Sequence, residues 1–213
     1  MSNPLHLNLC KDNESYPLRQ GKRRETTLQE VKFDLKNDLV KLFYCFKSAV
    51  DMYNSKYAGV PPNELVRNYV SINFNQCLVS SAFKNFRNKC FFGKYKRFYF
   101  NIEGYTILFK KLNSKGRPMN VRTGNVNSIN DQLTLDLFGD SNTNNPILFF
   151  GYKVDKLGNF VEPQIIYIDE GVIKFCISEN DIINLKFQEI QNDINFDNND
   201  VKLKTGKEFK KVN

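Results

Sequence analysis

Hydrophobic residues recur at steps of three and four over the first part of the chain, which is the spacing of one face of an α-helix. This pattern covers residues 28–53 and predicts one long helix, with Thr27 and Glu30 forming a capping box at its start. Glycine and two prolines then interrupt the pattern, and Asn63 can cap a second helix over residues 65–86. The two segments predict an antiparallel helical hairpin.

The pattern changes at Cys90 from helical spacing to runs of aromatic and β-branched residues. Residues 91–102 and 105–112 predict two strands joined by a Glu-Gly turn. Three further runs, separated by turn residues, predict an antiparallel meander over residues 147–154, 160–168 and 172–177.

These elements together predict an α+β fold, in which the N-terminal helical hairpin packs on an antiparallel β-hairpin and meander. Ser178 and Asp181, three residues apart, indicate the start of a short C-terminal helix. The expected boundaries are a flexible arm over residues 1–26, a single domain over 27–190 with helices in 27–89 and strands in 90–177, and a flexible tail over 191–213.

The composition is that of a folded protein without a membrane-spanning segment. Of 213 residues, 41% are hydrophobic and 14% aromatic, which supplies enough apolar surface for a core. No run of about 18 uncharged apolar residues occurs, and the polar N-terminus does not fit a secretory signal, so we expect a cytoplasmic location. Abundant Lys, Asn, Ile and Phe, without Trp, are typical of the AT-rich genes of a low-GC bacterium or its mobile elements.

Side chains for catalysis or metal binding are few. The five cysteines lack CxxC spacing, so we expect reduced thiols and no zinc site. His6 is the single histidine, which leaves nucleophile systems and most acid–base schemes without their usual base. We therefore predict no catalytic centre, no metal and no cofactor.

A Mg²⁺-dependent nuclease is a distant alternative, because Mg²⁺ needs only oxygen ligands. Its carboxylates would be Glu162, Asp169 and Glu170, at strand ends of the meander. The spacing from Glu170 to Lys174 departs from the pattern of restriction-like nucleases, and a solvated turn explains the same residues.

Charge is distributed very unevenly along the chain. Residues 84–122 carry 11 basic residues and one acidic residue, a net charge of +10, in a chain whose net charge is +8. Residues 123–200 carry 4 basic and 13 acidic residues, a net charge of −9. The counter-charge of the basic block is therefore either an outside polyanion such as nucleic acid or the protein's own acidic block.

Aromatic residues are interleaved with the cations of the basic block, as they are where nucleic-acid bases stack in a positively charged groove. The side chains predicted to contact phosphates are Lys94, Lys96, Arg97, Lys110, Lys111, Lys115, Arg117 and Arg122. The loop cations within residues 110–122 are the better candidates, because no acidic residue lies near them in the sequence. Alternation also fits a half-buried strand, and most of these aromatic residues are expected in the core.

The segment from Gln132 to Phe138, with the sequence QLTLDLF, resembles the short peptide with which bacterial polymerases and repair proteins bind the replication sliding clamp. The resemblance is confined to this segment. It implies that Gln132 enters a small polar pocket of the clamp, with Leu133 beside it. The apolar pocket of the clamp would take Leu135, Leu137 and Phe138.

The setting of this segment predicts that it is accessible. Asn-rich residues on both sides indicate flexible flanks, and exposed apolar residues in a flexible segment need a partner to cover them. The alternative is that the three leucines form one face of a strand on the core.

These features lead to a hypothesis of a non-enzymatic, nucleic-acid-associated accessory protein of a bacterium or mobile element. It binds phosphates through the basic block and docks the sliding clamp through residues 132–138. The alternative is a protein-binding module, an inhibitor or antitoxin-like partner, whose acidic half covers a basic surface on another protein. We expect no membrane partner.

Overall fold

The computed structural model describes residues 21–57, 59–66, 68–120, 123–134, 137–138 and 144–183. The helices are α1 (Leu28–Asp34), α2 (Lys36–Tyr57), η1 (Pro62–Glu64), α3 (Tyr69–Asn85), η2 (Arg87–Lys89), η3 (Lys94–Lys96) and α4 (Gly124–Asn130). The strands are β1 (Cys90–Phe92), β2 (Phe98–Ile102), β3 (Tyr105–Lys111), β4 (Ile147–Val154), β5 (Phe160–Asp169) and β6 (Val172–Ser178). This order of helices and strands confirms the predicted α+β class.

The six strands form one sheet in the order β1-β2-β3-β4-β5-β6, with β1 and β6 at its edges. Strands β3 and β4 are parallel, whereas every other neighbouring pair is antiparallel. The wholly antiparallel sheet expected from the sequence is therefore wrong at this pair. A parallel pair needs a long crossover connection between the end of one strand and the start of the next. Residues 112–146, which include α4, make this connection from β3 to β4.

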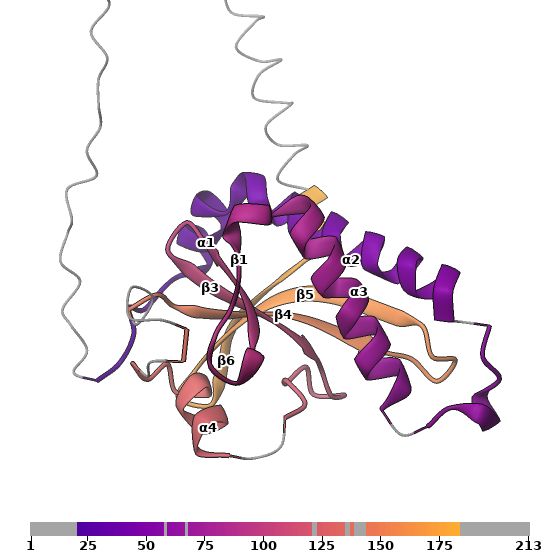
Figure 1. Ribbon diagram of the computed structural model, residues 1–213. Coiled ribbons are helices and arrows are strands. Elements are labelled where there is room, and N and C mark those ends of the chain that lie inside the picture. The colour runs from indigo at the N-terminus through magenta and orange to yellow at the C-terminus, as the bar shows by residue number, and fades with distance from the viewer. Residues whose placement is uncertain are drawn as a thin grey trace, which may run out of the picture.

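The helices α2 and α3 cover one face of the sheet, and Figure 1 shows α3 crossing in front of the strands with α4 below them. Side chains of alternating strand residues point to this face because the side-chain period of a strand is two. They include Ile107, Phe150 and Tyr167, which join the main hydrophobic core. Phe46 of α2 and Phe74 of α3 meet edge to face with ring centroids 5.8 Å apart, so the predicted helical hairpin packs as expected.

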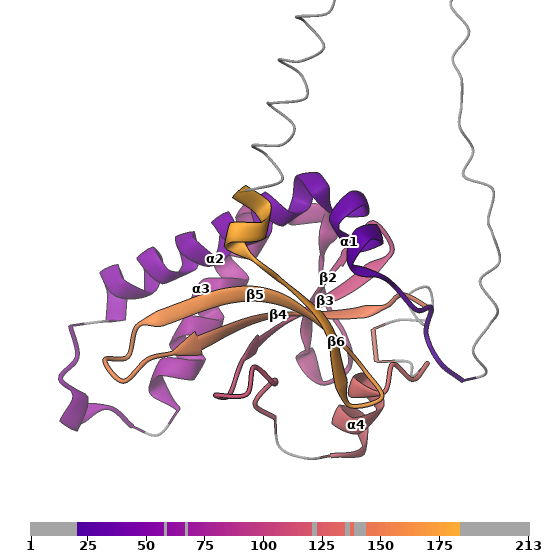
Figure 2. The ribbon, with the colours of Figure 1, turned by 180° about the vertical axis from the view of Figure 1, so that it is seen from behind.

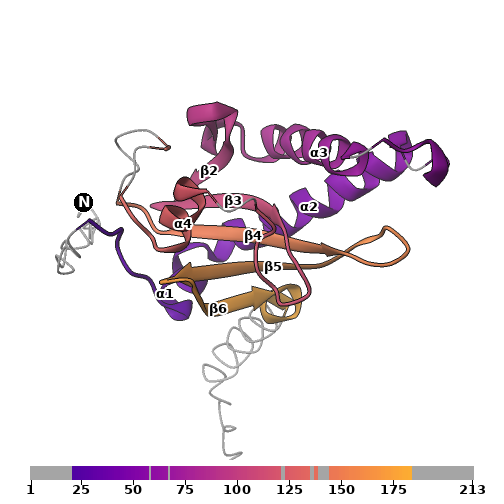
Figure 3. The ribbon, with the colours of Figure 1, turned by 90° about the horizontal axis from the view of Figure 1, so that it is seen from below.

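The opposite face of the sheet carries a second, smaller core under α4. Its members are Tyr99, Leu108, Leu112, Ile129, Leu137, Phe138, Ile147, Phe149, Ile166 and Ile168. Figure 3, which views the molecule from below, shows α4 lying over β3 and β4 on this face. Both faces of the central strands are thus covered, which explains why β4 and β5 read as nearly continuous apolar runs.

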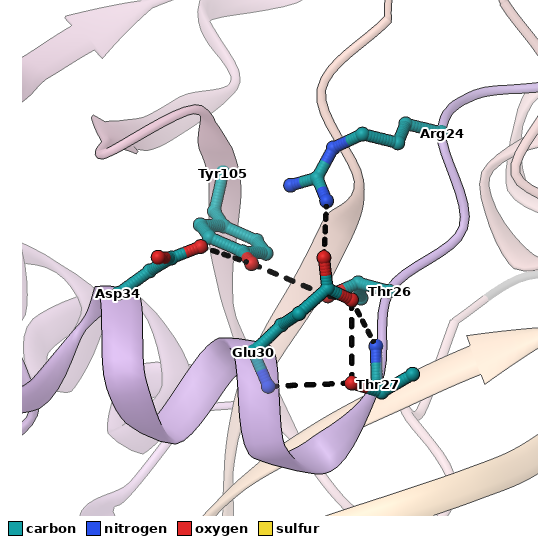
Figure 4. Close-up of polar contacts among 6 residues, drawn as sticks. All are labelled: Arg24, Thr26, Thr27, Glu30, Asp34 and Tyr105. Atoms are coloured by element: carbon teal, nitrogen blue, oxygen red, sulfur yellow. Dashed lines mark hydrogen bonds and ion pairs between the residues drawn. The ribbon is translucent and has the colours of Figure 1, made fainter. Parts of the chain in front are cut away.

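The predicted long helix is divided at Leu35, which lies outside helical geometry at φ −94° and ψ 7°. The expected capping box at the start of α1 is confirmed: the Glu30 amide donates to Thr27 Oγ1 at 3.3 Å, and the Thr27 amide donates to Glu30 Oε2 at 2.8 Å. Figure 4 shows this box together with the Tyr105 hydroxyl, which donates to Asp34 Oδ2 at 2.9 Å. The network joins α1 to β3.

The second helix starts later than the sequence indicates. Asn63 lies in η1, and α3 begins at Tyr69 after Asn68, whose φ of +69° is left-handed. Asparagine adopts this conformation more readily than most residues, because its short polar side chain bonds locally.

At the other end of the described chain, residues 179–183 form the expected helical turn after Ser178. Figure 2 shows this turn beside α1, where Lys32 Nζ lies 3.7 Å from Asp181 Oδ1.

Residues 21–26, which we assigned to a flexible arm, belong to the packed domain. Arg23 is 1% exposed, and its guanidinium donates to Leu133 O at 3.1 Å and to Asn145 O at 2.9 Å. Burial lowers the pKa of Arg23 to about 10. Residues 1–20 and the expected tail over 191–213 lie outside the described residues.

Candidate nucleic-acid interface

The cations of the basic block lie at the β1 edge of the sheet, on β3 and in the loop that follows β3. Several of them form no ion pair within the part of the chain that the structure describes: Lys84, Arg87, Lys96, Arg97, Lys110, Lys111, Lys115 and Arg117. Lys94 is exposed in η3, and Arg122 lies outside the described residues. The block therefore keeps much of its positive charge at or near the surface.

Lys89 differs from these cations, because it forms two ion pairs. Its ammonium lies 2.9 Å from Asp38 Oδ2 on α2 and 3.1 Å from Glu103 Oε1 in the β2–β3 turn. Burial lowers the pKa of Lys89, but the two carboxylates raise it more, and the net direction is upward. This lysine serves the fold, by fastening the β-hairpin to the helical layer.

Five described carboxylates of the acidic block pair with lysines outside the basic block. The pairs are Lys22 with Asp169 and Glu170, Lys32 with Asp181, Lys47 with Glu179, and Lys153 with Glu162. Neutralisation of the basic block by the acidic block stays a prediction.

Most aromatic residues of the basic block lie in the core, as expected. Tyr99, Phe100 and Tyr105 are buried. Three aromatic side chains are exposed instead, because they lie on the edge strand and in the turn after it: Phe91 is 41% exposed, Phe92 is 55% exposed and Tyr95 is 82% exposed. Phe91 stacks on Tyr99 with ring centroids 5.7 Å apart, and Phe92 contacts Phe83 at 6.0 Å.

The turn that carries Tyr95 packs against the backbone of Leu137. Tyr95 and Lys96 have left-handed backbones, with φ of +58° and +54°. The Lys94 amide donates to Leu137 O at 3.2 Å. A Cβ on Gly93 would lie 2.3 Å from the same carbonyl oxygen, so only glycine fits this close approach. An exposed aromatic side chain and an exposed cation are therefore fixed in strained conformations, which is the kind of outlier that occurs at functional sites.

The loop after β3 presents a second group of cations. Asn113 Oδ1 accepts from the amides of Lys115 and Arg117 at 2.9 and 3.0 Å, and Gly116 takes a φ of +72°. This turn leaves the side chains of Lys115 and Arg117 exposed. The role of these cations in phosphate contacts stays a prediction.

A third group of polar side chains lines a pocket on the α4 face of the sheet. The pocket is lined by Arg97, Leu108, Lys110, Asn120, Val126, Ile129, Asn130 and Phe149. Burial lowers the pKa of Arg97, and burial together with the nearby charge of Arg97 lowers the pKa of Lys110. Asn120 and Asn130 could not be predicted as pocket residues, because asparagines in an Asn-rich stretch are typical of loops.

The segment from Gln132 to Phe138 does not form an accessible peptide. Gln132 is 0% exposed, and its amide donates to Ile147 O at 3.0 Å and to Ile168 O at 2.7 Å. Leu137 and Phe138 belong to the core under α4, and Leu133 is half-buried. Leu135 lies outside the described residues. The expectation of exposure is wrong because these side chains complete the second core.

The expected flexible flank before this segment is also wrong. Residues 124–130 form α4, which starts at Thr123, whose hydroxyl accepts from the Val126 amide. The Asn-rich stretch forms a helix because its Val126 and Ile129 face the sheet, where Ile129 is buried. We therefore propose no role for the sliding clamp.

The carboxylates of the nuclease alternative are not brought together. Glu162 lies near the start of β5 and Asp169 at its end, so they are separated by roughly 20 Å of strand at about 3.3 Å per residue. Glu162 pairs with Lys153, and Asp169 and Glu170 pair with Lys22. Among the described residues, no three side chains of His, Cys, Asp or Glu gather as a metal site.

Comparison with protein-family models, with curated proteins and with solved structures finds no match to this chain. None of the helices that the structure describes has the length and apolar character needed to cross a membrane. The functional argument therefore depends on the side chains themselves.

Proposed function

We propose that this protein is a non-enzymatic, nucleic-acid-associated accessory protein that binds a single strand through its basic block. The observation that carries the proposal is the exposed Tyr95 in the turn after β1, together with the exposed cations Lys96, Lys115 and Arg117, which have no carboxylate partner among the described residues. Phosphates supply the missing negative charge, and bases supply the aromatic faces that cover exposed rings.

The exposed rings favour a single strand over a duplex. Base faces are hidden inside a duplex but are open in a single strand, where each base stacks on an aromatic side chain. Phe91, Phe92 and Tyr95 lie within six residues of one another and are accompanied by Lys96. The loop of Lys115 and Arg117 adds exposed cations, which suit sequence-independent contacts with the phosphate backbone.

The alternative of a protein-binding module receives less support. Its acidic half would need exposed carboxylates, yet Glu162 and Glu179 are already paired with Lys153 and Lys47 of the same chain. Replacing such partners by those of another protein brings little net gain.

The test is binding of a fluorescein-labelled 15-nucleotide single strand, followed by fluorescence anisotropy at about 0.1 M salt. A Lys96→Ala, Lys115→Ala, Arg117→Ala variant is compared with a control of equal charge loss, Lys56→Ala, Lys156→Ala, Lys174→Ala, whose side chains are exposed away from the basic block. We expect the first variant to lose affinity by about tenfold or more and the control by less than about twofold. Equal losses in both variants, or no binding by the wild type, would contradict the proposal.

A further inference from the structure

Two cations of the basic block face each other across the pocket on the α4 side of the sheet. Arg97 precedes Tyr99 by two residues and Lys110 follows Leu108 by two, and both Tyr99 and Leu108 belong to the core on this face. The period of two along a strand therefore directs Arg97 and Lys110 to the same side. Phe149 and Ile129 line the apolar remainder of the pocket.

Two buried polar atoms of this pocket lack hydrogen-bond partners within the described structure. They are Arg97 Nη1 and Asn130 Oδ1. Of the described residues that line the pocket, none is acidic. A buried donor on a cation, left without an acceptor, costs free energy that a bound anion would recover. Because amide oxygen and nitrogen are interchangeable by a rotation, Asn130 can also turn its NH₂ group towards an anion.

The size of the pocket limits what it can take. Its space is about 230 Å³ when the open solvent at its mouth is included, and the enclosed part is about 10 Å³. The enclosed part therefore takes about one oxygen atom of a small ligand, and a whole nucleoside does not fit. Arginine matches the oxygens of a phosphate with two parallel donors, and lysine adds a second point charge.

We propose that this pocket binds the terminal phosphate monoester of a nucleic-acid strand. The inference depends on the proposed function for its ligand and adds the chemical end that the protein recognises. A terminal phosphate approaches a dianion and has one covalent attachment, so three of its oxygens can reach the two cations at the mouth of the pocket. An internal phosphodiester carries one charge and continues on both sides, so it offers the two cations less negative charge.

The surroundings of the pocket fit a strand that ends there. Phe91 is exposed and stacks on Tyr99 of β2, two residues after Arg97. A base next to the terminal phosphate therefore finds an aromatic face near the pocket. The turn of Tyr95 and Lys96 immediately precedes Arg97 and continues the same surface towards the sheet edge.

The experiment compares one 15-nucleotide strand in three forms, with a 5′-phosphate, a 3′-phosphate or hydroxyl groups at both ends, each carrying an internal fluorophore. We expect the wild type to bind one phosphorylated form about tenfold more tightly than the hydroxyl form, and the two phosphorylated arms show which end is read. Arg97→Gln and Lys110→Met should each reduce this preference to less than about twofold, because each should lower affinity for the preferred phosphorylated form more than affinity for the hydroxyl form. Lys115→Gln, a control outside the pocket, should lower affinity for all three forms and keep the preference.

The outcomes separate this inference from the proposed function. If the wild type binds all three strands equally, or if both pocket variants keep the preference, the terminal-phosphate site is overturned and strand binding stands. If no strand binds, both the proposed function and the terminal-phosphate site are overturned. Thermal unfolding of Arg97→Gln and Lys110→Met verifies that each variant folds, and replacing a buried charge without a partner is expected to keep or raise Tm.

Discussion

The amide of Gln132 satisfies three buried backbone groups on two strands. It donates to Ile147 O and Ile168 O, and its Oε1 accepts from the Ile147 amide at 2.9 Å. Gln132 therefore satisfies both the backbone amide and the backbone carbonyl of Ile147, the first residue of β4. Ile147 is also where the parallel pairing of β4 with β3 begins. The backbone of Gln132 has a φ of +53°, so this position stores strain that its hydrogen bonds offset.

Gln132→Ala should therefore destabilise the fold strongly. It leaves three buried backbone groups without a partner and opens a cavity, and we expect the free energy of unfolding to fall by about 2–4 kcal/mol. Urea unfolding followed by circular dichroism measures the change. Thr134→Ala is the control, since this side chain is exposed, and it should change stability by less than about 0.5 kcal/mol. Similar stability of the two variants would show that the amide network is not needed.

Tyr95→Gly separates function from stability at one residue. Glycine adopts the left-handed backbone without strain, which offsets the greater freedom of glycine in the unfolded chain. We expect the free energy of unfolding to stay within about 1 kcal/mol of the wild type, while affinity for a single strand falls about tenfold because one stacking face is lost. Leu157→Ala, which removes another exposed apolar side chain from the β4–β5 turn, should leave affinity unchanged. A loss of stability without a loss of affinity would assign Tyr95 to the fold.

At the scale of elements, the start of the helix after β6 depends on Asp181. Its Oδ2 accepts from the Ser178 hydroxyl at 2.6 Å and from the Ser178 amide at 2.8 Å. These hydrogen bonds, with Lys32 nearby, lower the pKa of Asp181. Because a carboxyl with a lowered pKa stabilises the fold when ionised, its contribution is complete above the unfolded pKa of about 3.9 and is lost as the pH falls through the folded pKa.

Asp181→Asn should therefore cost stability at pH 7 and cost less as the pH falls below about 3.9. We expect under about 1 kcal/mol at pH 7, because Asp181 is partly exposed and its ion pair with Lys32 is screened. Urea unfolding between pH 7 and pH 3 measures the difference between variant and wild type. Asp51→Asn, which removes an exposed carboxylate on α2, is the control for the loss of one negative charge. A difference that grows at acid pH would reverse the assigned direction of the pKa shift.

Periodicity in the sequence predicts most elements but not their joints. The stripe over residues 28–53 predicts α1 and α2 as one helix, because a break that keeps Leu35 buried leaves the apolar spacing intact. The parallel pairing of β3 with β4 depends on where residues 112–146 carry the chain, and no local pattern encodes that path. The core role of residues 132–138 is likewise set by tertiary contacts.

At the scale of the whole molecule, the two sheet faces give the thiols different surroundings. Cys45, Cys77 and Cys90 are buried between the helices and the sheet, whereas Cys176 is exposed on the edge strand β6. Burial raises the pKa of Cys45 to about 11 and that of Cys90 to about 12. These thiols therefore remain protonated and inaccessible at pH 8 in the folded protein.

In a Cys10→Ser background, one thiol should react rapidly with Ellman's reagent at pH 8, and Cys176→Ser should remove that fast phase. The other three should react only as fast as the protein unfolds, and rapidly in 6 M urea. Absorbance at 412 nm follows the reaction. Fast reaction of all four thiols under native conditions would contradict the core assigned to α2, α3 and β1.

The charge pattern allowed the position of the candidate interface to be predicted better than its details. The 11 basic residues within 84–122 predict a positive surface in any fold, because most of so many charged side chains must stay in contact with water. Which aromatic rings face solvent could not be predicted, because Phe91 and Tyr99 differ only through the position of β1 at the sheet edge. The sequence could not predict that Arg97 and Lys110 line one pocket, because this depends on the register of the strands.

The most direct measurement is the salt dependence of binding between 50 and 300 mM NaCl. The ligand is a single-stranded 15-mer with an internal fluorophore and hydroxyl groups at both ends. If about four phosphates are contacted by the cations of residues 84–117, log K falls linearly with log salt at a slope of about −3, which is roughly 0.7 per phosphate on a single strand. The Lys96→Ala, Lys115→Ala, Arg117→Ala variant should show a slope near −1. Wild-type affinity that is independent of salt, or no measurable binding at 50 mM, would contradict the account.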